Sequence, residues 1–160
     1  MKYARLSMGD LKDLEDEFVK FLILNGITAE DWEKLKRDEN DKAELIIDQF
    51  SDTIWEGILR KTDMLELRRK DFLTLCYTKD NVLYTFVIKA PNSKINFTSG
   101  KDIDKVLSSS EDYEVTIRKD IITRPVTEQL FEFIKVGFYI TKDETYRSFL
   151  ESQVSQYVTS

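Results

Sequence analysis

The chain has 160 residues, of which 41% are hydrophobic and 34% are charged, and its formal net charge is −6. This length and this balance fit one globular domain over residues 1–160. The sequence contains no histidine and one cysteine, Cys76, which excludes Ser-His-Asp and Cys-His catalysis, histidine-containing metal sites, disulfides within the chain and iron–sulfur clusters.

Apolar residues at helical spacing predict three helices in the first 62 residues. The first is expected over about residues 7–26, since Ser7 can cap it and Gly26 can end it. The second starts after Thr28, and the third covers about residues 41–61. The third helix is apolar on two sides, which is typical of a helix between other elements or between the domain and a partner.

The hydrophobic period changes to two after the third helix, which indicates strands. Residues 64–69, 71–78 and 82–89 alternate and are rich in Leu, Val, Phe and Tyr. Residues 78–81 are typical of a tight turn, so these three strands are expected to form an antiparallel meander. A fourth strand is expected over residues 113–118.

Three further helix starts follow from capping residues. Ser99 precedes a short helix, Pro125 precedes a buried one, and Thr141 precedes the last. The expected fold class is therefore α+β, with three N-terminal helices packed on a small antiparallel sheet of about four strands and two C-terminal helices closing the core.

Four phrases of the sequence are distinctive in combination: residues 1–6 (MKYARL), 27–34 (ITAEDWEK), 50–56 (FSDTIWE) and 140–142 (ITK). Together they resemble a family of short bacterial proteins classed as a domain of unknown function, family 6495, which occurs in Bacteroidetes. The resemblance covers nearly the whole chain and is strongest in the N-terminal helices. It implies a bacterial cytosolic origin, and it supplies no activity and no functional residues.

Acidic residues recur every four positions along the third predicted helix, at Glu44, Asp48, Asp52 and Glu56. Like charges at this spacing destabilise an isolated helix, and lysines elsewhere in the fold suffice to offset them. Three interpretations stay open for this acidic stripe: a solvated face, a partner-binding surface, or a site for magnesium, manganese or calcium at Asp48, Asp52 and Glu56.

A second apolar cluster lies on the far side of the same helix, at Leu45, Trp55 and Leu59. Tryptophan is common in binding hot spots, so these residues are the candidate partner-binding site.

Two functional hypotheses follow from these features. The leading hypothesis is a non-catalytic interaction or accessory protein that binds a protein partner or a second copy of itself. The alternative is a divalent-metal-binding protein or metal-dependent enzyme that uses the acidic stripe. No catalytic residue and no cofactor are predicted.

Other sequence features bear on the role of Cys76, on a nucleic-acid or membrane partner, and on the location of the protein. Cys76 falls in a predicted strand with no basic neighbour, so it is expected to act as a small hydrophobic residue. The one basic cluster, residues 68–70, sits in a chain of pI about 4.9, which argues against a nucleic-acid partner. The first residues show no secretory pattern, and the apolar stretch 21–24 is too short to span a bilayer. A cytoplasmic protein without a membrane partner is therefore expected.

Overall fold

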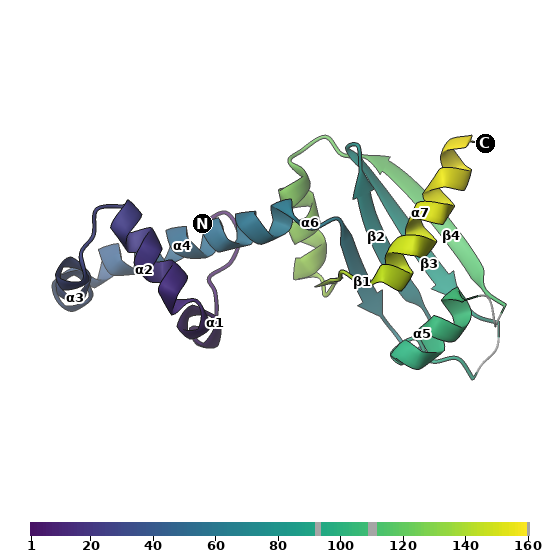
Figure 1. The fold of residues 1–160 in the computed structure, drawn as a ribbon, viewed down its shortest axis with the longest axis horizontal. Helices are drawn as coiled ribbons and strands as arrows, with labels where there is room; N and C mark the ends of the chain where they lie inside the picture. Colours follow the sequence, from purple (N-terminus) through teal and green to yellow (C-terminus); the bar gives the residue numbers. More distant parts are fainter. Residues whose placement is uncertain (92–93, 109–111, 160) are drawn as a thin grey trace. The chain divides into compact units, whose positions relative to one another are not determined.

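The computed structural model describes residues 1–91, 94–108 and 112–159, and it divides the chain into two compact units (Figure 1). We call Met1–Ile58 the helical unit and Leu59–Ser160 the sheet unit, and each is described by itself. The described residues form seven helices and one five-stranded antiparallel sheet, so the predicted α+β class is confirmed. The expectation of a single domain over residues 1–160 stays a prediction.

The helical unit contains one helix more than the sequence predicts. The expected first helix is two helices, α1 (Met8–Asp13) and α2 (Glu15–Leu24), with Leu14 between them. This break puts three acidic residues, 15–17, in the first turn of α2, where the helix dipole favours negative charge. The other two helices agree with the prediction: α3 (Ala29–Asp38) and α4 (Asn40–Arg60).

The core of the helical unit is small and aromatic. Phe50 of α4 is 1% exposed, and its ring centre lies 5.0 Å from that of Phe18 and 5.4 Å from that of Phe21, both on α2. Phe18 also meets Trp32 of α3 edge to face at 5.1 Å. These ring contacts hold α2, α3 and α4 together, because aromatic pairs in this geometry add about 0.5–1.5 kcal/mol beyond the apolar area that they bury.

The sheet unit has the strand order β4-β3-β2-β1-β5. The four predicted strands are present, and a fifth strand of two residues pairs with β1. So short a strand has no alternating pattern, which is why the sequence did not reveal it. The strands are β1 (Met64–Arg68), β2 (Leu73–Lys79), β3 (Val82–Lys89), β4 (Glu114–Ile121) and β5 (Tyr139–Ile140).

The predicted turn between β2 and β3 is a two-residue hairpin loop. Lys79 pairs with Val82, and Asp80 and Asn81 between them have φ angles of 53° and 61°. Two positive φ angles are typical of a type I′ turn, whose twist matches that of the flanking strands. Asp and Asn tolerate this left-handed conformation better than other residues with a side chain, so the local sequence selects the turn.

Helices cover the two faces of the sheet. One face packs under α5 (Gly100–Leu107) and α7 (Glu144–Thr159), which cross it in Figure 1. The core between these helices and the sheet includes Leu75 of β2, Phe86 of β3 and Leu150 of α7, all at most 1% exposed. On the other face, side chains of β3, β4 and α6 (Val126–Lys135) line a hollow.

Candidate interaction surface

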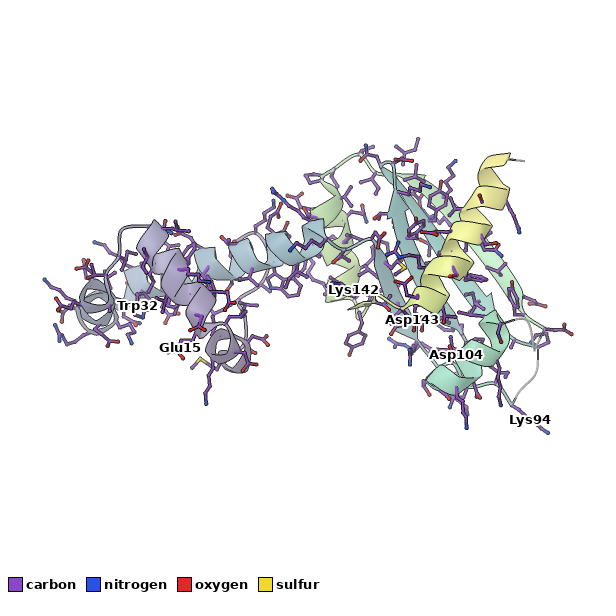
Figure 2. All side chains as sticks on the ribbon, viewed as in Figure 1. Glu15, Trp32, Lys94, Asp104, Lys142 and Asp143 are labelled. Carbon is purple, nitrogen blue, oxygen red and sulfur yellow. The ribbon has the colours of Figure 1, made fainter. Side chains whose placement is uncertain are left out.

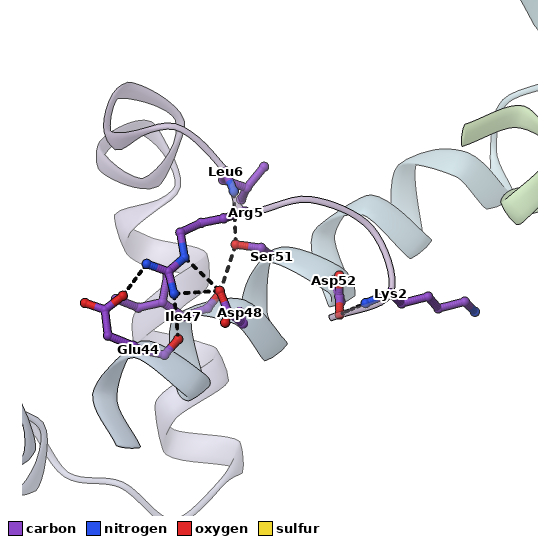
Figure 3. Close-up of polar contacts among 8 residues, drawn as sticks. All are labelled: Lys2, Arg5, Leu6, Glu44, Ile47, Asp48, Ser51 and Asp52. Carbon is purple, nitrogen blue, oxygen red and sulfur yellow. Dashed lines mark hydrogen bonds and ion pairs between the residues drawn. The ribbon is translucent and has the colours of Figure 1, made fainter. Parts of the chain in front are cut away.

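The acidic stripe of α4 binds the N-terminal arm of the chain, residues 1–7 (Figure 3). The two carboxylate oxygens of Asp52 accept hydrogen bonds from the backbone N–H groups of Lys2, at 2.7 Å, and Tyr3, at 2.8 Å. Glu56 accepts a hydrogen bond from the Tyr3 hydroxyl and forms an ion pair with Lys2 at 3.4 Å. A carboxylate that accepts from backbone donors makes stronger hydrogen bonds than a neutral acceptor.

Arg5 completes the attachment of this arm. Its guanidinium group donates to Asp48 at 2.7 Å and also contacts the Glu44 carboxylate. The hydrogen bonds to Asp48 and Glu44 raise the pKa of Arg5 above its ordinary value. One residue further on, the Leu6 N–H donates to the Ser51 hydroxyl at 3.1 Å. All four stripe carboxylates therefore offset their mutual repulsion by binding the arm.

The metal interpretation of the stripe gains no support from this geometry. Within residues 1–91, 94–108 and 112–159, no group of three or more His, Cys, Asp or Glu side chains is arranged to hold a metal ion. Asp48 and Asp52 direct their oxygens to Arg5 and to the arm backbone instead.

The three predicted partner-binding residues have different surroundings in the structure. Leu45 is 57% exposed, so its side chain is accessible to a partner. Trp55 is half-buried. Leu59 is 1% exposed and begins the sheet unit, so its side chain offers no surface. The structure thus leaves Leu45 and Trp55 as candidates, and their role stays a prediction.

Exposed apolar side chains are concentrated in the helical unit, and sequence reasoning did not single most of them out. Ten large apolar residues are exposed among those described, and seven belong to residues 1–58. On α2, Val19 is 48% exposed, Ile23 is 66% exposed and Leu24 is 86% exposed. The seven are Met1, Met8, Val19, Ile23, Leu24, Leu45 and Ile58.

Two adjoining hollows open along α2. The first has a volume of about 420 Å³ and lies between α2 and α3, where Val19 and Ile23 face Trp32. The second, of about 680 Å³, lies beside α1 and is lined by Met8 and Leu11. Both include Glu15, Phe18 and Lys36, so we treat them as one groove and call it the α2 groove. Figure 2 labels Glu15 and Trp32, which come from its two walls.

One sequence feature could have revealed this groove. Residues 21–24 are four consecutive apolar residues, and they follow another apolar pair at 18–19. A helix of this composition is apolar almost all round, whereas the small core of the helical unit needs only one face. The remaining apolar face must then lie at the surface or meet a partner.

The sheet unit offers weaker candidates for a site. Cys76 is 0% exposed, and its burial raises the pKa of the thiol to about 12, which disfavours the thiolate at neutral pH. The hollow beside α6 has a volume of about 370 Å³ and mixes polar and apolar side chains, among them Thr85, Arg118 and Phe133. Neither gathers groups with a defined chemical role.

The fold and this surface define an α+β protein with an apolar groove in its helical unit. The chain belongs to the Family of unknown function (DUF6495), whose family model matches residues 1–154. No curated protein and no solved structure matches the chain. In the described part of the chain, no helix is both long enough and apolar enough to span a membrane.

Proposed function

We propose that this protein is a non-catalytic interaction protein of the bacterial cytoplasm, and that its helical unit holds the partner. The observation that carries the proposal is the concentration of exposed apolar side chains in that unit, together with the α2 groove. Exposed apolar patches rimmed by polar residues are typical of protein-binding sites. Leu45 and Trp55 on α4 are the second part of the proposed binding surface.

Composition supports a protein partner over other classes. Residues 1–58 contain eight Lys and Arg against fifteen Asp and Glu, so the helical unit has a net charge of −7. Such a unit repels nucleic-acid phosphates and anionic lipid surfaces. An apolar surface with an acidic surround suits a protein that presents apolar and basic side chains together.

Site-specific photo-crosslinking in the cells that express the chain tests this proposal. A photoreactive amino acid replaces Ile23 in one variant and Leu45 in another. In the matched control it replaces Val136, an equally exposed apolar residue of the sheet unit. We expect discrete crosslinked products from positions 23 and 45, and none from position 136.

The products also distinguish the two kinds of partner. A product of higher mass that contains a second protein supports a hetero-complex, and a product with twice the chain mass supports a homo-oligomer. Absence of products at 23 and 45, or the same products from all three positions, contradicts the proposal.

A further inference from the structure

The α2 groove is already formed in the free chain, because its floor is packed from below. Phe18 meets Trp32 and Phe50 edge to face at 5.1 Å and 5.0 Å, and these contacts fix the rings that line the groove. The ammonium group of Lys36 lies 5.8 Å from the centre of the Trp32 ring and forms an ion pair with Glu33 at 2.9 Å. A preformed floor lowers the ordering cost that a ligand must offset when it binds.

The walls of the groove favour a helix as its occupant. Both walls are helices, whose backbone N–H and C=O groups are already bonded within each helix. An extended peptide would find no backbone partners there, whereas a helix satisfies its own backbone groups and needs only side-chain contacts. The groove follows α2, which has ten residues and spans about 15 Å, so an occupant helix of about three turns matches it.

The negative charge around the groove favours an occupant helix with a positive charge. Glu15 and Lys36 both lie where the two hollows adjoin, and Lys12 lines the second hollow. Lys36 forms an ion pair with Glu33, whereas Glu15 forms no ion pair with any described residue. The first turn of α2 adds two more acids, Asp16 and Glu17. Residues 8–38 as a whole contain five basic and nine acidic residues, a net charge of −4. This field attracts a cationic partner, and it opposes the approach of a second helical unit with its own charge of −7.

We infer that the α2 groove binds a basic amphipathic helix of a partner protein, with the apolar face of that helix on Val19, Ile23 and Trp32 and a Lys or Arg beside Glu15. The inference rests on the proposed function and adds the class of partner. Apolar anchors at positions i, i+3 or i+4, and i+7 supply affinity, and the flanking cations supply the preference over acidic helices.

A fluorescence-anisotropy titration with defined peptides tests the inference on the full chain. The probe is a labelled synthetic amphipathic helix of about 16 residues, with Leu at positions i, i+3, i+4 and i+7 and Lys on the flanks. One control peptide has the same apolar face with Glu in place of Lys. A second has the composition of the probe in an order that gives no apolar face.

Matched variants of the chain locate the site. Ile23→Ser removes an apolar side chain that lines the groove. Leu24→Ser changes the neighbouring, more exposed residue, which lines neither hollow. Glu15→Gln removes the unpaired charge, and Glu17→Gln changes an acid of the same helical turn outside the groove. Val19→Ser serves as a second wall variant if Ile23→Ser does not fold, which circular dichroism reports.

The probe is expected to bind saturably, and both control peptides at least about tenfold more weakly. Ile23→Ser should weaken binding by about tenfold or more, and Glu15→Gln by severalfold with a smaller dependence on salt. Leu24→Ser and Glu17→Gln should match the wild type. Equal binding of the Lys and Glu peptides, equal effects of the matched variants, or no binding at all overturns the inference.

A second copy of the chain is the other possible occupant of the groove. Analytical ultracentrifugation tests for it by measuring the oligomeric state. A dimer that Ile23→Ser dissociates would show that the groove binds a second copy of the chain, which also overturns the inference. If photo-crosslinking at position 23 captures a partner while the probe does not bind, the proposed function stands and the basic helix alone is rejected.

Discussion

The helical unit and the sheet unit differ in how many of their apolar side chains are buried. Among the described residues, the sheet unit has twenty-one buried hydrophobic side chains and three large exposed ones, whereas the helical unit has five buried and seven exposed. Their net charges are +1 and −7. The sheet unit thus buries most of its apolar side chains in its own core, whereas the helical unit leaves more of them exposed than buried.

This comparison predicts that the two units differ most in how they tolerate loss of a core side chain. Phe50→Ala should cost about 3–5 kcal/mol, because the Phe50 ring contacts two others in the small core of the helical unit. Small domains have little stability to lose. Trp32 and Trp55 both lie in residues 1–58, so tryptophan fluorescence reports this unit, and alkylation of Cys76 reports the sheet unit.

We therefore expect Phe50→Ala to shift the fluorescence transition to much lower urea while Cys76 stays protected from alkylation. The matched change in the sheet unit is Phe86→Ala, at a residue that is also 1% exposed. It should expose Cys76 at lower urea. Loss of both signals together in Phe50→Ala would break the comparison, since the two units would then unfold as one.

The second prediction concerns alkaline pH and the sheet unit. Burial raises the pKa of Cys76 to about 12 from 9.0, and burial also raises the pKa of Tyr77. The folded chain therefore holds these protons more tightly than the unfolded chain does. For Cys76 the resulting stabilisation is complete below about pH 9 and is lost as pH rises toward 12, by up to about 1.4 kcal/mol per pH unit, and Tyr77 contributes a loss in the same direction.

Urea unfolding at a series of pH values from 8 to 11, followed by circular dichroism, measures this loss. Cys76→Ala should reduce the slope of stability against pH, because one of the titrating groups is gone. An unchanged slope in Cys76→Ala would show that the thiol is not buried as the structure has it.

The third prediction concerns the arm on the acidic stripe. Asp52→Ala should destabilise the helical unit by about 1–2 kcal/mol, because two backbone N–H groups of the arm lose a charged acceptor. Gln49→Ala, at an exposed position of the same helix, should change stability by less than about 0.5 kcal/mol. Both are measured by urea unfolding with tryptophan fluorescence. Equal effects of the two variants would mean that the arm contributes no stability.

The smallest expected effect lies in the hairpin of the sheet unit. Asn81→Ala should cost about 1 kcal/mol, since alanine at a φ of 61° is strained. Asn81→Gly should be neutral or slightly stabilising, because glycine adopts this conformation without strain. Thermal unfolding of the two variants decides this, and identical values would contradict the type I′ assignment.

Hydrophobic period and capping residues were enough to predict the fold class, four strands and most helix starts. They did not predict β5, which is too short to show a period, nor the break at Leu14, where no Gly or Pro interrupts the helical pattern. The acidic stripe was visible in the sequence, but its ligand was not. Lys2 and Arg5 lie more than 35 residues away, and only tertiary structure brings them to α4.

The candidate partner-binding site was also only partly predictable from the sequence. Leu45, Trp55 and Leu59 were selected because they lie off the main apolar face of one helix. The Leu59 side chain is nevertheless only 1% exposed, because burial depends on neighbouring elements that a helical wheel does not contain. The α2 groove requires α1, α2 and α3 together, so no single stretch of sequence defines it.

The most direct test of the central claim is a two-dimensional amide and indole NMR spectrum of the full chain, recorded with and without the basic amphipathic peptide. The account predicts shifts at the Trp32 indole and along α2, at Val19 and Ile23, with β4 and the rest of the sheet unit unchanged. Shifts confined to the sheet unit, or a Trp32 indole that does not move at saturating peptide, would contradict it.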